Sequence, residues 1–122
     1  MEEKRAEELK NTTLTINGNV WAIKLVDDMT IKIAYTTGKI KKKEALYGLT
    51  VYGKSTIYLN SEYLQDVQML KKILKHELTH AIIWEFSMDK EAFNEEEICD
   101  FMGSYADMVV NLANQWETQV SY

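Results

Sequence analysis

Proline is absent from this sequence, and its five glycines are scattered rather than gathered with serine. Proline and stretches rich in glycine and serine mark linkers and domain boundaries, so their absence predicts that residues 1–122 form a single domain. A chain of this length has room for one modest core and for no separate substrate domain. Any active site is therefore expected to be a shallow cleft.

Cysteine occurs once, at Cys99, so no internal disulfide can form, which agrees with a reducing compartment. The segment Met1 to Lys10 is charged and lacks the apolar stretch of a secretion signal. No run of about eighteen apolar residues, the length that spans a membrane, is present either. We therefore expect a cytoplasmic protein without membrane contacts.

Basic residues are fewer than acidic ones, 14 against 19, which gives a net charge of −5. This balance argues against general nucleic-acid binding, and the local basic run of Lys39 and Lys41 to Lys43 is typical of a solvated loop. Charged residues make up 27% of the chain and hydrophobic ones 46%. Such a composition is typical of a folded, water-soluble domain, and we expect a monomer.

Alternating apolar residues predict strands in the N-terminal half, after a charged lead-in over residues 1–12. The pattern from Thr13 to Val26 surrounds Asn17-Gly18-Asn19, which predicts a β-hairpin. A further strand is expected within Met29 to Lys43. The segment Glu44 to Asn60 predicts a pair of strands, with a break at Gly53-Lys54.

Two long helices are expected in the C-terminal half. The first opens at Ser61 and Glu62 and runs to about Phe86, and the second runs from about Asn94 to Trp116. The first is apolar on two sides, which is typical of a helix buried between layers. We predict an α+β fold, in which a small antiparallel or mixed sheet packs on these two helices. One continuous apolar arc of the second helix is the expected core face: Ile98, Phe101, Met102, Tyr105, Val109, Leu112 and Trp116.

The chain's only two histidines form the run His76-Glu77-Leu78-Thr79-His80, the H-E-x-x-H arrangement of zinc-dependent hydrolases. Residues i and i+4 of a helix lie one above the other, so both imidazoles can bind one metal while the Glu77 carboxylate points into the same cleft. The alternative is a structural pair, with one histidine against the core and the other in solvent. A helix that is apolar on two sides favours an interior cleft and hence the metal site.

A catalytic zinc has three protein ligands and an open position for water, so one ligand is missing from this pair. No histidine remains, which leaves a carboxylate or Cys99, and the acidic run from Glu95 to Glu97 is the natural source. Glu96 shares a helix face with Asp100, so we predict Glu96 as the ligand and Asp100 as the acceptor behind it, with Glu97 as the alternative ligand. Acidic residues also favour the first turn of a helix without any metal.

The order H-E-x-x-H followed by Glu96-x-x-x-Asp100-x-x-Gly103 resembles the thermolysin-type gluzincins. In size and layout the chain is similar to the minigluzincins and to small metallopeptidases of phages and mobile elements. The immunity-type metallopeptidases that cut phage repressors share H-E-x-x-H and a downstream acidic ligand. The resemblance implies that Glu96 is the third ligand of one Zn²⁺ and that Asp100 accepts a hydrogen bond from His76. Gluzincins also use a downstream histidine or tyrosine on the tetrahedral intermediate, a role that is unassigned here.

These features predict a zinc-dependent endopeptidase that acts on a peptide or protein substrate. The metal lowers the pKa of its bound water toward neutrality, and Glu77 takes the proton as general base. The strand before the metal helix, Thr56 to Asn60, is the expected platform for an extended substrate, although an ordinary edge strand explains it equally well. Tyr58 and Tyr63 are candidates for donating a hydrogen bond to the oxyanion, and packing is their alternative role.

A binding protein is the main competitor of the enzyme interpretation. A catalytically silent, zinc-stabilised binding or inhibitor module, such as a phage-type protein that blocks a host factor, fits the same sequence. Glu77 favours the enzyme because a purely structural zinc site does not need it. A hydrolase of another bond type uses the same zinc water, and the motif alone does not separate it from a peptidase.

Overall fold

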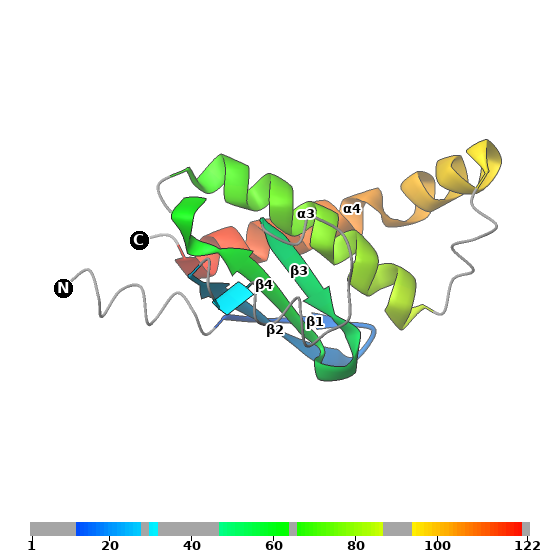
Figure 1. Cartoon of the computed structure of the whole chain (residues 1–122). Helices are drawn as coiled ribbons and strands as arrows, with labels where there is room; N and C mark the ends of the chain where they lie inside the picture. Colours follow the sequence, from blue (N-terminus) through cyan, green and yellow to red (C-terminus); the bar gives the residue numbers. More distant parts are fainter. Residues whose placement is uncertain (1–11, 28–29, 32–46, 64–65, 87–93, 121–122) are drawn as a thin grey trace.

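The computed structural model of the chain describes residues 12–27, 30–31, 47–63, 66–86 and 94–120. A four-stranded mixed sheet in this part of the chain carries two long helices against one of its faces (Figure 1). The predicted α+β fold is therefore confirmed. In chain order the elements are β1 Thr12–Ile16, β2 Asn19–Val26, β3 Gly48–Val51, η2 Tyr52–Lys54, β4 Thr56–Asn60, η3 Ser61–Tyr63, α3 Val67–Glu85 and α4 Glu95–Val120.

The first hairpin closes through a turn of two residues. β1 and β2 pair antiparallel, with Ile16 opposite Asn19. Between them, Asn17 and Gly18 have φ angles of 51° and 80°. Positive φ at both positions is what an Asn-Gly turn supplies, and its twist matches that of the flanking strands. The predicted hairpin is confirmed.

The strand order in the sheet is β1-β2-β4-β3. The strand pair predicted within Glu44 to Asn60 is confirmed as β3 and β4, which pair antiparallel with η2 between them. β4 also pairs in parallel with β2, so it has a neighbour on both sides. The prediction that Thr56 to Asn60 is a platform open to substrate is therefore wrong, because its edges are already hydrogen bonded. Among the described strands, β3 is the edge strand next to β4.

Only two residues of the strand predicted within Met29 to Lys43 are described, and both are helical. The amide of Thr30 donates to the Asp27 carboxylate at 2.7 Å, and the amide of Ile31 donates to the Asp27 carbonyl at 3.1 Å. Asp27 thus caps a helical turn, so the strand prediction is wrong at these two positions. The rest of that segment and the lead-in up to residue 11 lie outside the described residues.

α3 is held in place at both ends. It starts later than predicted because the Asp66 carboxylate caps it, accepting a hydrogen bond of 2.9 Å from a first-turn amide. At the other end, the Glu85 carboxylate accepts hydrogen bonds from Asn19 Nδ2 at 2.6 Å and Trp21 Nε1 at 2.7 Å, and Asn17 Nδ2 donates to the Glu85 carbonyl at 3.2 Å. A carboxylate at a helix C-terminus is unfavourable by itself, and these donors from the first hairpin offset that cost.

The two faces of the sheet carry separate apolar clusters. The main core lies between the sheet and the helices and combines alternate strand residues with one side of each helix, because side chains of a strand alternate between its faces. The far face carries a smaller cluster of Ile31 and Leu49 with Val26, Val51 and Tyr58. The largest fully buried members of the main core are Ile16, Trp21, Ile23, Ile57, Leu59, Leu70, Leu74, Leu78, Ile82 and Trp116.

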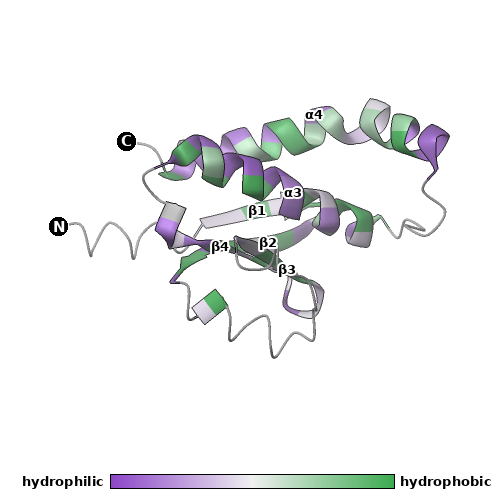
Figure 2. Cartoon of the chain, turned by 45° about the horizontal axis from the view of Figure 1, so that its top comes forward, coloured by the Kyte–Doolittle hydropathy of each residue, from purple (hydrophilic) through white to green (hydrophobic). Residues whose placement is uncertain are grey.

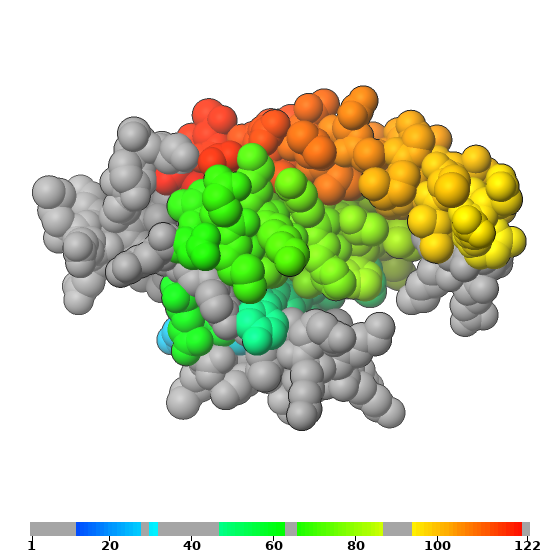
Figure 3. All heavy atoms as spheres, turned by 90° about the horizontal axis from the view of Figure 1, so that it is seen from above, coloured from blue at the N-terminus to red at the C-terminus, as the bar shows by residue number. Residues whose placement is uncertain are grey.

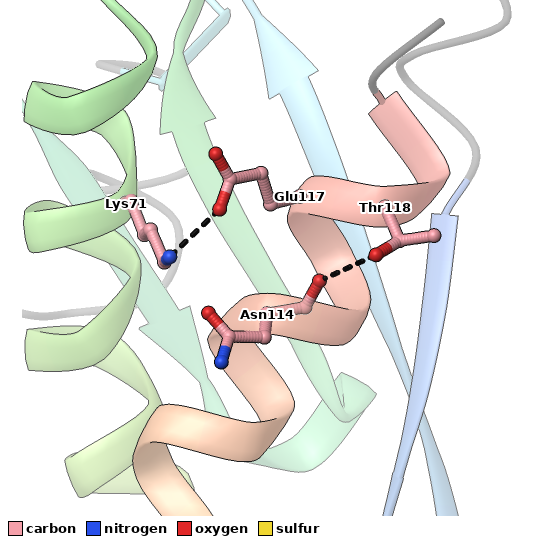
Figure 4. Close-up of polar contacts among 4 residues, drawn as sticks. All are labelled: Lys71, Asn114, Glu117 and Thr118. Carbon is pink, nitrogen blue, oxygen red and sulfur yellow. Dashed lines mark hydrogen bonds and ion pairs between the residues drawn. The ribbon is translucent and has the colours of Figure 1, made fainter.

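α3 and α4 lie side by side and run antiparallel (Figure 3). Near the start of α3, Lys71 Nζ forms an ion pair of 2.7 Å with Glu117 Oε1 near the end of α4 (Figure 4). Just after the end of α3, the ring of Phe86 lies 5.3 Å from that of Tyr105. No helix within the described ranges combines the length and the apolar character needed to cross a membrane.

α4 is longer than its neighbour, and its first turns extend past the end of α3 (Figure 1). It begins one residue later than predicted because the Asn94 side chain caps it, accepting from a first-turn amide at 3.0 Å. The predicted apolar arc is buried only from Val109 onward. Ile98 and Met102 are 52% and 55% exposed. The core prediction is therefore wrong for these two residues, since they lie on the part of α4 that passes α3.

Candidate functional site

The two histidines lie one turn apart on the same side of α3. Their ring centroids are 5.0 Å apart, with an angle of 74° between the ring planes. Two imidazoles bound to one tetrahedral zinc at the usual Zn–N distance have centroids roughly 5 Å apart, so His76 and His80 fit this part of a metal site. His76 is exposed and His80 is partly buried. The prediction of an interior cleft is thus wrong for His76, because the sheet packs on the neighbouring side of α3.

Glu77 occupies the side of α3 that faces β3 and is only 5% exposed. The hydroxyl of Thr50 donates a hydrogen bond of 2.6 Å to Glu77 Oε1 and lies 3.2 Å from the Glu77 carbonyl oxygen. A buried carboxylate is costly without such a donor. β3 therefore fixes the orientation of the carboxylate that follows the first histidine.

Gly48 brings the backbone of β3 against the same carboxylate. A Cβ placed on Gly48 would lie 2.7 Å from Ile73 Cγ2, 3.1 Å from Glu77 Cγ and 3.2 Å from Glu77 Oε2. The requirement for glycine here comes from this close approach and not from its φ angle. A side chain at this position would require the side chain of Ile73 or Glu77 to shift.

We expect Gly48→Ala to lower the free energy of unfolding by about 1–3 kcal/mol, because the added methyl group overpacks the contact with Ile73. Urea denaturation measures the loss. Gly53→Ala is the matched control, since a Cβ on Gly53 meets nothing within 4 Å. Ile73→Ala makes room, so Gly48→Ala should cost less in that background. Equal stability of the Gly48 and Gly53 variants would contradict the close packing.

A pocket of about 180 Å³ adjoins the carboxylate and the first histidine. Drug-sized ligands occupy pockets of about 300–1,000 Å³, so this one fits a single side chain or a few waters. Its walls combine apolar side chains of α3 with the residue that precedes β3. The lining residues are Tyr47, Met69, Lys72, Ile73, His76 and Glu77.

Tyr52 stacks on Trp84, with ring centroids 4.9 Å apart and an interplanar angle of 22°. Burial raises the pKa of the Tyr52 hydroxyl above its usual 10.0, and the negative charge of Glu77 raises it further. Tyr52 therefore keeps its proton at neutral pH and remains a hydrogen-bond donor close to Glu77.

Tyr58 and Asn60 do not lie beside Glu77. Strand alternation places Tyr58 on the far face of the sheet, where it packs against the cluster of Ile31 and Leu49. Asn60 is buried, and its Oδ1 accepts a hydrogen bond of 3.0 Å from the Glu62 amide at the start of η3. The structure thus corrects the placement of both residues, while the side chain of Tyr63 lies outside the described part.

Glu96 and Asp100 are exposed on the first turns of α4, away from the histidines. Tyr105 contacts Phe86 at the end of α3. Glu96 lies nine residues before Tyr105, roughly 13 Å along α4. His80 lies six residues before Phe86, roughly 9 Å along α3. Because the helices are antiparallel, these two offsets point in opposite directions from the Phe86–Tyr105 contact. Among the residues that the structure describes, no three His, Cys, Asp or Glu side chains come close enough to bind one metal ion.

The structure therefore brings together His76, Glu77 and His80 but does not add Glu96 or Asp100 to them. The sequence correctly placed these two acidic residues on one helix, but the register between the antiparallel helices decides which turns meet. That register is set by core contacts such as those of Val109 and Leu112, which a helical wheel does not reveal.

The residues that were missed by the sequence come from β3 and its ends. Alternation along the strand puts Gly48 and Thr50 on one face and Leu49 on the other. This alternation was predictable from the sequence. Which of the two faces meets α3 was not predictable, because it depends on the place of β3 in the sheet. Tyr52 comes directly after β3, so its position near Glu77 also depends on where β3 lies in the sheet.

Comparison with known proteins gives no relative from which residue roles can be taken. No family model matches the chain, and neither a curated protein nor a solved structure matches it. The roles of residues in this site are thus assigned from contacts within the chain.

Proposed function

We propose that this protein is a zinc-dependent endopeptidase that cleaves a peptide or protein substrate in the cytoplasm. The observation that carries the proposal is the pairing of His76 and His80, one turn apart with ring centroids at 5.0 Å, next to a buried and hydrogen-bonded Glu77. When bound, zinc supplies a Lewis acid and a water whose pKa is lowered toward neutrality.

Glu77 acts as the general base in this proposal. Its Oε1 is held by Thr50, and the Oε2 side adjoins Gly48, where no side chain obstructs the carboxylate. Glu77 takes the proton of the attacking water and hands it to the leaving amine. Tyr52, protonated and close to Glu77, replaces Tyr58 as the phenol that donates to the oxyanion.

The substrate strand is proposed to pair with β3 rather than with β4. The amide of Asn60 donates to the Tyr47 carbonyl at 2.9 Å, so alternate residues from Tyr47 onward direct their backbone groups toward β4. Gly48 and Thr50 then direct theirs to the outer side, where an extended peptide can add as a strand. One substrate side chain would enter the pocket beside His76.

The third zinc ligand in this proposal comes from the first turns of α4. Glu96 remains the proposed ligand, with Asp100 as the residue that accepts a hydrogen bond from His76. Zinc binding by Glu96 requires α4 to approach the histidines more closely than it does in this structure. Glu97 and Cys99 lie on the same exposed turns. Metal analysis of the corresponding alanine variants assigns the ligand.

Metal content and proteolysis of the purified chain test the function. We expect one zinc per chain and cleavage of an unfolded, fluorescently labelled casein that a chelator abolishes and added zinc restores. Zinc binding without any cleavage would favour the other candidate, and absence of zinc binding would contradict both.

That other candidate is a catalytically silent, zinc-stabilised binding or inhibitor module. The observation in its favour is the burial of Glu77, since a carboxylate that only holds β3 against α3 would make the same hydrogen bond to Thr50. The two candidates differ in what Glu77→Gln does, because only an enzyme loses its function through this change.

A further inference from the structure

The first turns of α4 carry apolar side chains that the described part of the chain leaves exposed. Ile98 and Met102 lie one turn apart and are 52% and 55% exposed. They continue the same helix side that is buried from Val109 onward. Figure 2 shows hydrophobic bands along the part of α4 that extends past α3. The apolar side of α4 therefore extends beyond the part of the helix that packs on α3.

α4 also has charge of only one sign. Between Glu95 and Val120 it contains six acidic residues and neither lysine nor arginine. Two of the acidic residues, Glu95 and Glu97, are exposed and flank Ile98, at roughly 60° on one side of the helix and 100° on the other. The exposed apolar side chains are therefore bordered by negative charge.

We infer that the first turns of α4 dock a basic amphipathic helix of a partner protein. The apolar side of such a helix packs on Ile98 and Met102, and its lysines or arginines approach Glu95 and Glu97. The available length from Ile98 to Tyr105 is roughly 10 Å, about two helical turns, which suits two anchors spaced by one turn. A second copy of this chain is a poor occupant, because pairing α4 with α4 brings together only like charges.

Fluorescence anisotropy with a labelled 18-residue peptide tests this inference, the peptide consisting of leucine and lysine in amphipathic helical order. We expect the Ile98→Ser/Met102→Ser variant to bind at least about 10-fold more weakly than the unchanged chain, because both apolar contacts are lost. Glu95→Gln/Glu97→Gln should also bind more weakly and with a smaller dependence on salt. Val110→Ser is the matched control, since Val110 is 43% exposed on another side of α4.

Further measurements decide between occupants. A peptide of the same composition in shuffled order should bind at least about 10-fold more weakly, since it has no apolar side. Circular dichroism checks that the variants keep their helices. The inference is overturned if Ile98→Ser/Met102→Ser binds as tightly as Val110→Ser, or if sedimentation shows a dimer of the chain that the serine changes dissolve. All of these measurements use the metal-free chain, so their result stands apart from the proposed peptidase activity.

Discussion

Glu77→Gln is expected to keep its zinc and to lose at least about 100-fold in peptide cleavage, the usual scale for removing a general base. Glutamine has nearly the same size, and its carbonyl oxygen can still accept the hydrogen bond that Thr50 donates to Oε1 at 2.6 Å. Folding should therefore be retained. The amide cannot take a proton from water, so the initial rate of cleavage at equal zinc content is the measurement.

Glu62→Gln is a suitable control, because Glu62 is an exposed carboxylate outside the site. It should leave the cleavage rate within about twofold, as surface changes away from special features have small effects. Wild-type cleavage by Glu77→Gln would refute the assignment of the base. If the unchanged chain cleaves no substrate while Glu77→Gln keeps its full effect in cells, the binding module is the better interpretation.

The second large effect is expected from the histidines. His76→Ala and His80→Ala should each weaken zinc binding by more than about 100-fold, since even the loss of a group that merely orients a ligand costs about 10- to 100-fold. Competition with a chromogenic chelator measures the affinity. Glu96→Ala should weaken zinc binding to a similar extent if Glu96 is the third ligand, and an affinity equal to that of the unchanged chain would remove Glu96 from the proposed ligands.

Thr79→Ala provides the control for these changes within the same turn of α3. The Thr79 hydroxyl donates to the Lys75 carbonyl at 2.8 Å and has no metal-binding role in the proposal. Zinc affinity should be unchanged in this variant. An equal loss in Thr79→Ala would show that the histidine variants act through the stability of the helix.

Features that depend on neighbouring residues were predictable from the sequence. The Asn17-Gly18 turn forces a hairpin because both residues tolerate positive φ, and the structure has this turn where it was expected. The side-by-side placement of His76 and His80 follows from helical spacing alone. Each of these features depends only on residues a few positions apart in the chain.

Features that depend on how elements meet were not predictable. β4 has the same alternation whether it lies at an edge or inside the sheet, and only its parallel pairing with β2, Ala22 opposite Thr56, decides the matter. The apolar arc of α4 gave no indication of where α3 ends, so Ile98 and Met102 were assigned to the core. In both cases the deciding contact joins segments far apart in the chain.

The contacts around Glu77 also imply an order in which the site forms during folding. The two histidines are four residues apart, so they are aligned as soon as this part of α3 becomes helical. The contact of Thr50 with Glu77 spans 27 residues, and that of Trp21 with Glu85 spans 64, so both require chain closure with its entropic cost. A chain that has formed α3 but not the sheet therefore presents its imidazoles with an unplaced carboxylate. The two histidines are thus aligned before Glu77 is held in place, and the proposed site is complete only when the sheet closes.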